Sequence, residues 1–190
     1  LKVKDMYEDN PYPRYRYADH TDKSLAKKIS EAIKFESTKN NLQFSEALTT
    51  DHSRPKVLIA GCGTGNQVIN ASRYKNAQIT AIDLSNSSLA YATRKTKDYA
   101  MENVCFEQMD LLEAVHLDEL FDIIECGGVL HHMEDPAKGL SALNDQLKLF
   151  GYIKLGLYSE IARQQIVEAR NRISQLGFNS SPAGIREFRQ

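Results

Sequence analysis

From Arg54 onward, apolar runs of four to six residues alternate with longer segments of helical spacing, and this alternation limits the possible folds more than any other feature. The apolar runs are 57–60, 79–82, 104–109, 121–126 and 152–157. The segments of helical spacing are 66–74, 85–101, 111–119 (a short helix or turn) and 136–149. Strand–helix repetition predicts an α/β fold with a doubly wound, mainly parallel sheet and helices on both faces. Continuous apolar runs fit that fold, because parallel strands are covered on both sides.

The two flanks lack this alternation. Residues 1–20 are predicted to be irregular, since Pro11 and Pro13 push the residues before them towards extended conformations. A helix is predicted over 23–36, capped by Thr21 or Asp22, and then a polar stretch, 37–54. That stretch has a short apolar patch at Leu42, Phe44, Ala47 and Leu48. A long helix is predicted over 159–176, closed by Gly177, and the start of another follows.

Composition excludes several classes of protein. A chain of 190 residues fits one domain, or one domain with an appendage. A formal net charge of -1 lacks the basic signature of a nucleic-acid binder. The apolar runs are too short to cross a membrane. The first 17 residues have no signal-peptide core, so the three cysteines are expected to be reduced thiols in the cytoplasm.

A glycine-rich turn follows the first apolar run. Its residues are Gly61, Cys62, Gly63, Thr64 and Gly65. Glycines allow a sharp turn and a close approach of a ligand to the main chain, and the next helix offers free N–H groups to a negative group. The G-x-G-x-G spacing differs from the G-x-G-x-x-G of dinucleotide folds, and no Lys-Ser/Thr pair follows it. The alternative is a purely structural strand-to-helix turn.

Two aspartates end the next two strands. Asp83 follows 79–82, where a carboxylate can accept both hydroxyls of a ribose, and Asp110 follows 104–109, where it can accept from an adenine amino group. Ligands of open α/β sheets bind at the carboxyl ends of the strands. For each aspartate taken alone, a helix cap is the competing interpretation.

Taken together, these motifs resemble those of the class I S-adenosylmethionine-dependent methyltransferases, which have a Rossmann-like sheet. The resemblance covers 55–158 and rests on four segments: 57–65, Ile82-Asp83-Leu84-Ser85, Gln108-Met109-Asp110-Leu111, and 121–132 with its ending Leu130-His131-His132. Asn10–Arg14 and 157–163 are similar to methyltransferase domains of bacterial proteins that also contain tetratricopeptide repeats. Two departures are Ile59, where the family often has an acid, and 147–151, where it has Leu-Lys-Pro-Gly-Gly.

The resemblance implies S-adenosylmethionine as the cofactor, and it places the cofactor-binding residues. They are Gly61, Cys62, Gly63, Thr64, Gly65, Asp83, Leu84, Asp110, Leu111, Cys126 and Gly127. Because Ile59 is not acidic, the cofactor's ammonium needs another partner, and backbone carbonyls near Cys126 and Gly127 are candidates. Cys62 and Cys126 are expected to be small packing residues, since no base for a nucleophilic thiolate is evident.

Transfer of an activated methyl group needs positioning above all, and a base only when the nucleophile holds a proton. His131 or His132 is the candidate base; a structural hydrogen bond is the alternative. A lid over the cofactor is expected from the aromatic N-terminal segment, with Tyr12, Arg14 and Tyr158 as substrate or lid residues; packing of its tyrosines outside the sheet is the alternative. No metal site is expected, because the ligand spacings of zinc sites are absent.

The predicted organisation has three parts: an N-terminal segment and helix forming a lid (1–54), a cofactor-binding core (55–158) and a helical extension (159–190), with the final strand pair of the sheet outside this chain. We expect a cytoplasmic bacterial methyltransferase with a small-molecule or protein acceptor, no nucleic-acid or membrane partner, and a tetratricopeptide-repeat domain in the full-length protein. Asn-Pro-Pro-Tyr, the signature of amino methylation on bases and glutamine, is absent after 121–126. The alternatives are a nicotinamide-dependent oxidoreductase and a non-catalytic cofactor-binding domain in a repeat protein.

Overall fold

A computed structural model describes residues 2–41, 53–159, 161–179 and 181–189. It divides into two compact units, 1–156 and 157–190. The apolar patch predicted at Leu42, Phe44, Ala47 and Leu48 lies outside the described residues. Among the described residues, no helix combines the length and the apolar character that crossing a membrane requires.

The first unit is built on a five-stranded parallel sheet in the order β3-β2-β1-β4-β5. Its strands are β1 (Lys56–Ala60), β2 (Gln78–Asp83), β3 (Val104–Gln108), β4 (Phe121–Gly127) and β5 (Leu147–Gly156). The predicted Rossmann-like fold is therefore confirmed, and each strand includes a predicted apolar run, although β5 begins earlier than predicted. The strand order reverses between β1 and β4, and ligands of such sheets bind at this switch point.

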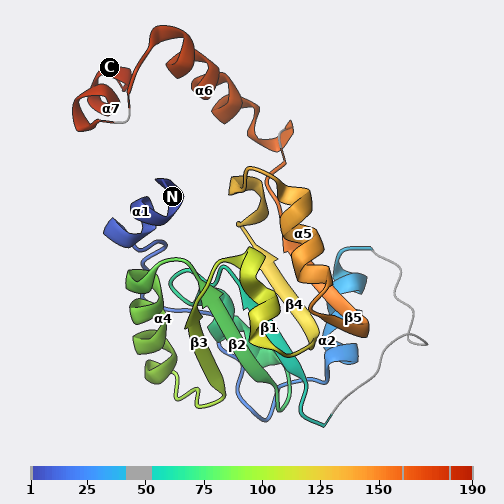
Figure 1. Ribbon diagram of the computed structural model, residues 1–190. Helices are drawn as coiled ribbons and strands as arrows, with labels where there is room; N and C mark the ends of the chain where they lie inside the picture. The colour runs from blue at the N-terminus through green and yellow to red at the C-terminus, as the bar shows by residue number, and fades with distance from the viewer. Residues whose placement is uncertain (1, 42–52, 160, 180, 190) are drawn as a thin grey trace. The chain divides into compact units, whose positions relative to one another are not determined.

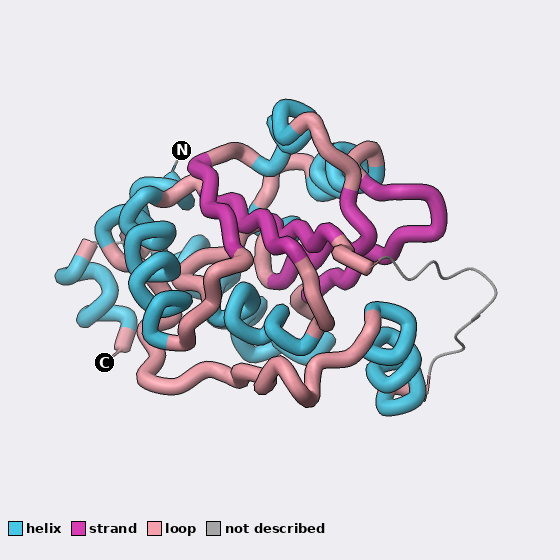
Figure 2. Tube along the Cα trace, turned by 90° about the horizontal axis from the view of Figure 1, so that it is seen from below, coloured by secondary structure: helices cyan, strands magenta, loops and turns pink. Residues whose placement is uncertain are grey.

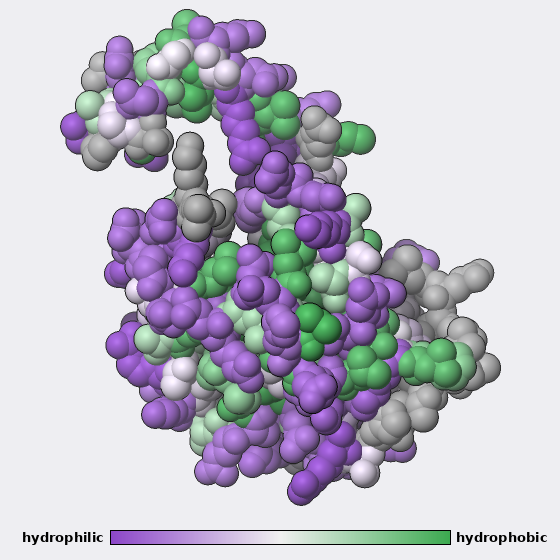
Figure 3. Space-filling model, viewed as in Figure 1, coloured by the Kyte–Doolittle hydropathy of each residue, from purple (hydrophilic) through white to green (hydrophobic). Residues whose placement is uncertain are grey.

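Helices cover both faces of the sheet (Figures 1 and 2). They are α1 (Lys2–Asp9), α2 (Ile29–Lys39), α3 (Asn66–Asn70), α4 (Asn86–Asp98) and α5 (Pro136–Asn144), with 3-10 helices at Ala71–Arg73, Leu111–Leu117 and Leu130–His132. One core cluster joins the sheet to α2, α3 and α4, and includes Ile29, Ile59 and Val68. The other joins it to α5 and the 3-10 helices Leu111–Leu117 and Leu130–His132, and includes Leu58, Leu111 and Leu143. Hydrophilic residues cover most of the face seen in Figure 3, with hydrophobic ones scattered among them.

The N-terminal segment differs from the prediction in two places. Residues 2–9 form the helix α1 and are not irregular, since the prolines restrict the chain only from Asn10 onward. The next helix, α2, begins at Ile29 and not at residue 23. Lys27 is the reason: its N–H donates to the Arg73 carbonyl and its own carbonyl accepts from the Lys75 N–H, which holds this part of the chain extended.

The predicted helix 136–149 is too long by five residues. It ends at Asn144, and β5 begins at Leu147, which pairs with Phe121 of β4. The Phe121 N–H also donates to the Gln146 carbonyl at 2.9 Å. Leucine spacing suits a helix here, but the pairing with β4 extends the chain instead, so a tertiary contact overrides the local pattern.

The second unit is helical. A 3-10 helix (Ile161–Arg163) leads into α6 (Gln164–Leu176), so the α-helix predicted from 159 begins five residues later. Gly177 ends α6 in the left-handed conformation, with φ of 72°, as its expected role requires. A further helix, α7 (Pro182–Phe188), is capped by Ser181, whose side chain accepts from the Gly184 N–H.

Candidate functional site

The glycine-rich turn joins β1 to α3 at the switch point. The N–H groups of Gly61 and Cys62 both donate to the Ile82 carbonyl of β2, each at 2.9 Å. Gly65 has φ of 90°, and a Cβ added there would lie 2.7 Å from the Cβ of Ala92 in α4. Glycine is therefore needed at this position for two reasons, the left-handed backbone and the contact with α4.

Asp83, the last residue of β2, faces this turn. Its Oδ2 accepts from the Gly63 N–H at 2.7 Å, and its Oδ1 accepts from the Ser85 N–H at 2.9 Å. Burial raises the pKa of Asp83 above its usual value, although these N–H groups act in the opposite direction. Each carboxylate oxygen keeps a second lone pair, so the group can still accept hydroxyl hydrogens. Ser85, not Asp83, caps α4.

The loops after β2 and β3 lie side by side. The Leu84 carbonyl accepts from the Gln108 side chain at 3.1 Å, and the Met109 N–H donates to the Asp83 carbonyl at 3.0 Å. Asp110 caps the following 3-10 helix, because its Oδ1 accepts from the Leu112 N–H at 2.9 Å. Leu84 is exposed and Leu111 buried. The structure thus brings the residues expected at an adenine site to one edge of the sheet.

Residues 10–18, which we call the strap, cross the glycine-rich turn. The Thr64 hydroxyl donates to the Pro13 carbonyl at 2.6 Å, and the Tyr15 hydroxyl donates to the Thr64 carbonyl at 2.9 Å. The Tyr91 hydroxyl of α4 donates to the Tyr15 carbonyl at 3.1 Å. Burial raises the pKa of Tyr15, so its hydroxyl keeps the proton that it donates.

The predicted lid residues do not make these contacts with their side chains. The side chains of Tyr12 and Arg14 are exposed, while their neighbours Pro13 and Tyr15 reach Thr64. Sequence reasoning missed Tyr15 and the Pro13 carbonyl, since three tyrosines in eight residues give no sign of which one turns inward. Tyr158 belongs to the second unit, where the Arg163 guanidinium lies 3.7 Å above its ring.

The two cysteines near the turn are packing residues in a buried setting. Cys62 and Cys126 are 4% and 0% exposed. Burial raises the pKa of the Cys126 thiol to about 11 and that of Cys62 well above its usual value, where the Asp83 charge adds to the effect. Neither thiol is set up to be a thiolate nucleophile at neutral pH.

His131 and His132 form a 3-10 helix with Leu130 directly after β4. Their rings lie 4.2 Å apart, and the His132 N–H donates to the Val129 carbonyl at 2.8 Å. His131 is half-buried and His132 exposed. No group of three or more candidate metal ligands occurs among the residues described.

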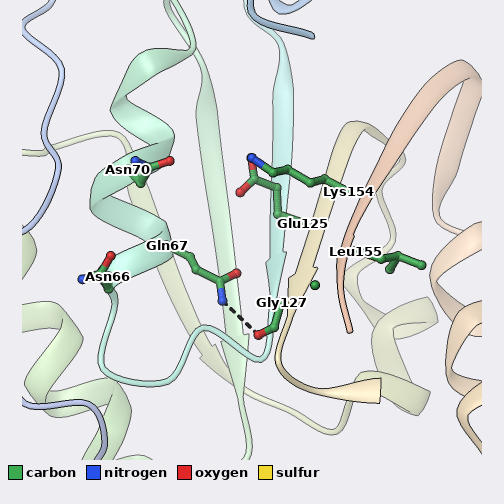
Figure 4. A pocket seen from close by; sticks show the side chains of 8 residues that line it. Asn66, Gln67, Asn70, Glu125, Gly127, Lys154 and Leu155 are labelled. Atoms are coloured by element: carbon green, nitrogen blue, oxygen red, sulfur yellow. Dashed lines mark hydrogen bonds between the residues drawn. The ribbon is translucent and has the colours of Figure 1, made fainter. Parts of the chain in front are cut away.

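A pocket of about 190 Å³ lies on the α3 side of the ends of β4 and β5 (Figure 4). Its lining residues are Asn66, Gln67, Asn70, Glu125, Gly127, Lys154, Leu155 and Gly156. The Gln67 side chain donates to the Gly127 carbonyl at 2.9 Å, which ties α3 to the end of β4. Of these residues only Gly127 was predicted. Glu125 carries the missed signal, a second acidic residue, after Asp122, inside a buried strand.

Glu125 is 5% exposed and is held by a charged network. The Tyr74 hydroxyl donates to its Oε1 at 2.7 Å, and the Arg73 guanidinium donates to the same oxygen. Arg73 also lies 3.3 Å from Glu36 of α2, and Lys154 lies 2.7 Å from that carboxylate. The charges of two acids, Glu36 and Glu125, are therefore balanced by those of two bases, Arg73 and Lys154. A buried charge such as that of Glu125 requires such a partner.

Comparison with known proteins identifies a family and relatives of this chain. The family model described as "Methyltransferase domain" matches residues 51–176. An uncharacterized protein of Synechococcus sp. is 38% identical over 125 residues, which are 65% of this chain and 30% of that protein. A ubiquinone biosynthesis O-methyltransferase of Alkalilimnicola ehrlichii is 30% identical over 99 residues, or 52% of this chain and 39% of that enzyme. The chain thus spans well under half the length of these two relatives.

Solved structures share the fold. The YcgJ protein of Bacillus subtilis superposes with a TM-score of 0.53 at 26% identity, covering 66% of this chain and 53% of that one. PKMT2 of Rickettsia typhi, solved in complex with AdoHcy, superposes with a TM-score of 0.59 at 24% identity. That match covers 92% of this chain and 33% of PKMT2.

Proposed function

Because this chain belongs to the methyltransferase domain family, we propose that it binds S-adenosylmethionine at the carboxyl ends of β1 to β4 and transfers the methyl group to an acceptor. The observation that supports this most is the position of Asp83. Its carboxylate lies between the Gly63 and Ser85 N–H groups, at the switch point of the sheet, with a lone pair left on each oxygen.

The residues present fit this cofactor. Asp83 accepts the ribose hydroxyls, and Leu84, Asp110 and Leu111 surround the adenine. The glycine-rich turn and the ends of β4 at Cys126 and Gly127 hold the methionine part. When bound, S-adenosylmethionine supplies a methyl group already activated on a sulfonium. The chain's own task is therefore to orient the acceptor and exclude water.

The strap serves as the lid in this proposal. The hydrogen bonds of Thr64 and Tyr15 hold it across the glycine-rich turn. The carbonyl oxygen of Tyr12 lies 3.5 Å from where a Gly63 Cβ would be, so the strap runs directly over the turn. Tyr12 and Arg14 of the strap then shape the acceptor side, Tyr158 of the second unit is proposed separately as a substrate or lid residue, and His131 or His132 serves as the base where the acceptor holds a proton.

Calorimetry tests the proposal. S-adenosylhomocysteine should bind and NAD should not, and methyl transfer from labelled S-adenosylmethionine should occur on an acceptor. Binding of NAD in place of S-adenosylhomocysteine would favour an oxidoreductase. Binding of S-adenosylhomocysteine without transfer to any acceptor would favour a non-catalytic domain.

The setting of the domain belongs to the same proposal. We propose a cytoplasmic bacterial protein with a small-molecule or protein acceptor, without nucleic-acid or membrane partners, which also contains tetratricopeptide repeats. Support comes from the likeness of Asn10–Arg14 and 157–163 to such proteins, the near-neutral charge and the free cysteines. The full-length protein, once sequenced through both ends, tests the repeats directly.

A further inference from the structure

A buried carboxylate lines the pocket beside β4 and β5. Glu125 lies at its base and is 5% exposed, so its charge was desolvated on folding and must interact with partners inside the protein. Figure 4 shows the side chain of Glu125 turned towards α3, which supplies Asn66 and Gln67 to the opposite wall. A buried carboxylate that faces a cavity can bind a ligand with hydrogen-bond donors.

The cationic side chains that border this pocket are already paired with carboxylates. Gln67 Nε2 donates to the Gly127 carbonyl. Arg73 donates through Nη1 to Asn70 and through Nη2 to Tyr74 and Glu125. Lys154 Nζ lies within 2.9 Å of both oxygens of Glu36. An anionic ligand would have to displace one of these pairs.

Hydrogen-bond acceptors remain available. The hydrogen bonds to Glu125 from described residues all reach Oε1, so its Oε2 has none of them. The side chains of Asn66 and Asn70, which also line the pocket, each add an amide oxygen, and that of Asn70 accepts from Arg73 and keeps a second lone pair. Three acceptors around one space match the three donors of a primary ammonium, whereas a hydroxyl offers only one.

We propose that this pocket binds the methyl acceptor by a primary amino group, with Glu125 as the residue that recognises it. The inference rests on the proposed function and names its substrate class. A pocket of about 190 Å³ is smaller than the ~300–1,000 Å³ typical for drug-sized ligands, so it takes a small amine or the amino end of a larger molecule.

The chemistry is balanced. The ammonium loses one proton to the proposed base, His131 or His132, and the freed nitrogen lone pair forms the new N–C bond. The C–S bond breaks with its electron pair on sulfur, which turns the sulfonium into a neutral thioether. The product is an N-methylated ammonium, and no oxidant or further reactant is needed. Glu125 holds the amine in place, so positioning supplies the catalysis.

Protein-observed NMR tests the pocket with benzylamine and its isosteres benzyl alcohol and benzoate, each titrated with and without S-adenosylhomocysteine. Benzylamine should bind at least tenfold more tightly than the other two and shift the amides of Gln67, Glu125 and Lys154. A peptide with one lysine, compared with benzylamine, distinguishes a protein acceptor from a free amine. Equal binding of all three isosteres would overturn the proposal.

Variants assign the site. Glu125→Gln should remove the preference for the amine and leave the Kd of S-adenosylhomocysteine within about twofold. Asn66→Ala is the second variant, for use if Glu125→Gln does not fold, because Asn66 takes part in no ion pair. It should weaken the binding of benzylamine several-fold. Glu119→Gln is the matched control, since this acid pairs with Lys56 at the other end of the sheet. If Glu125→Gln weakens the binding of S-adenosylhomocysteine and leaves the binding of benzylamine unchanged, the pocket belongs to the cofactor and the inference is overturned.

If the wild-type protein binds benzylamine but no S-adenosylhomocysteine, the proposed function alone is refuted.

Discussion

The carboxyl ends of the strands form two regions: a covered half around β1 and β2, and an open half around β4 and β5. The two halves differ in how many of their hydrogen-bonding groups have partners within the chain. Around β1 and β2, the strap covers the turn, and Asp83, Ser85 and Thr64 all have partners within the chain. Around β4 and β5, a pocket is lined by amide side chains and a buried carboxylate. In the first half each oxygen of Asp83 already accepts from a backbone N–H, while in the second half the Oε2 atom of Glu125 accepts no hydrogen bond from the described residues.

This difference matches a division of labour. A cofactor is the same in every turnover, so the half that binds it can be built from backbone N–H groups, glycines and one fixed acid. An acceptor is selected by side chains, because they alone vary in charge and shape. Under the proposed function, the ribose and adenine of the cofactor lie on the half around β1, β2 and β3, its methionine part reaches the end of β4, and the pocket beside β4 and β5 selects the acceptor.

The largest effect is expected from a glycine on the covered half. Gly65→Ala adds a Cβ 2.7 Å from that of Ala92, at φ of 90°. Left-handed backbone costs about 1–2 kcal/mol and overpacking about 1–3 kcal/mol, so the free energy of unfolding should fall by about 2–5 kcal/mol in urea titrations. Gly128→Ala is the control on the open half: φ is 81° but nothing lies within 4 Å, so only about 1–2 kcal/mol should be lost. Equal losses would mean that the halves are packed alike.

Removing the acid of the covered half should come next. Asp83→Ala should weaken the binding of S-adenosylhomocysteine by about 1.5–3 kcal/mol in calorimetry, because charge-assisted hydrogen bonds are lost. Asp135→Ala, which removes an exposed cap of α5, should leave the Kd unchanged. An unaltered Kd in Asp83→Ala would place the ribose elsewhere.

A smaller loss of stability is expected from a substitution in the strap. Tyr15→Phe removes the 2.9 Å hydrogen bond to the Thr64 carbonyl and should cost about 0.5–1.5 kcal/mol of unfolding free energy. Amide hydrogens of residues 14–18 should then exchange faster. Tyr17→Phe is the comparison, since Tyr17 is 75% exposed, and it should change neither quantity. Unchanged exchange in Tyr15→Phe would show that the strap is held by other contacts.

The reactivity of the cysteines towards a labelling reagent reports how far solvent reaches into each half, and here the smallest effect is expected. Cys62 lies on the covered half and Cys126 at the end of β4, and both are buried, whereas Cys105 is exposed. A pKa of about 11 for Cys126 leaves about one thiolate in a thousand at pH 8, and that fraction rises tenfold for each pH unit below 11. Native protein should therefore react with iodoacetamide once per chain at pH 8, and Cys105→Ser should abolish the reaction. Rapid labelling of Cys126 would show that the open half admits solvent deeper than its burial indicates.

Much of the fold was predictable from sequence, because each strand contains an apolar run, and such runs are expected where parallel strands are covered on both faces, as in β1. The errors share a cause. The start of α2 is set by the pairing of Lys27 with Arg73 and Lys75, and the start of β5 by the pairing of Leu147 with Phe121. Such long-range hydrogen bonds leave no mark in the local pattern, whereas Gly177, which acts locally, was placed correctly.

The site divides in the same way. The glycine-rich turn and Asp83 could be identified because glycines and strand-end acids are visible in a short window of sequence. The wall of the pocket could not, since Glu125 meets Asn66 and Lys154 only through the register of β4 and β5 and the packing of α3. Tyr15 was missed for the same reason: its partner, Thr64, lies 49 residues away.

The most direct test of this division is the affinity for S-adenosylhomocysteine of three proteins measured together by calorimetry: wild type, Asp83→Ala and Glu125→Gln. The account predicts a Kd raised more than tenfold in Asp83→Ala and unchanged within about twofold in Glu125→Gln. The opposite pattern, with the loss in Glu125→Gln and none in Asp83→Ala, would contradict it.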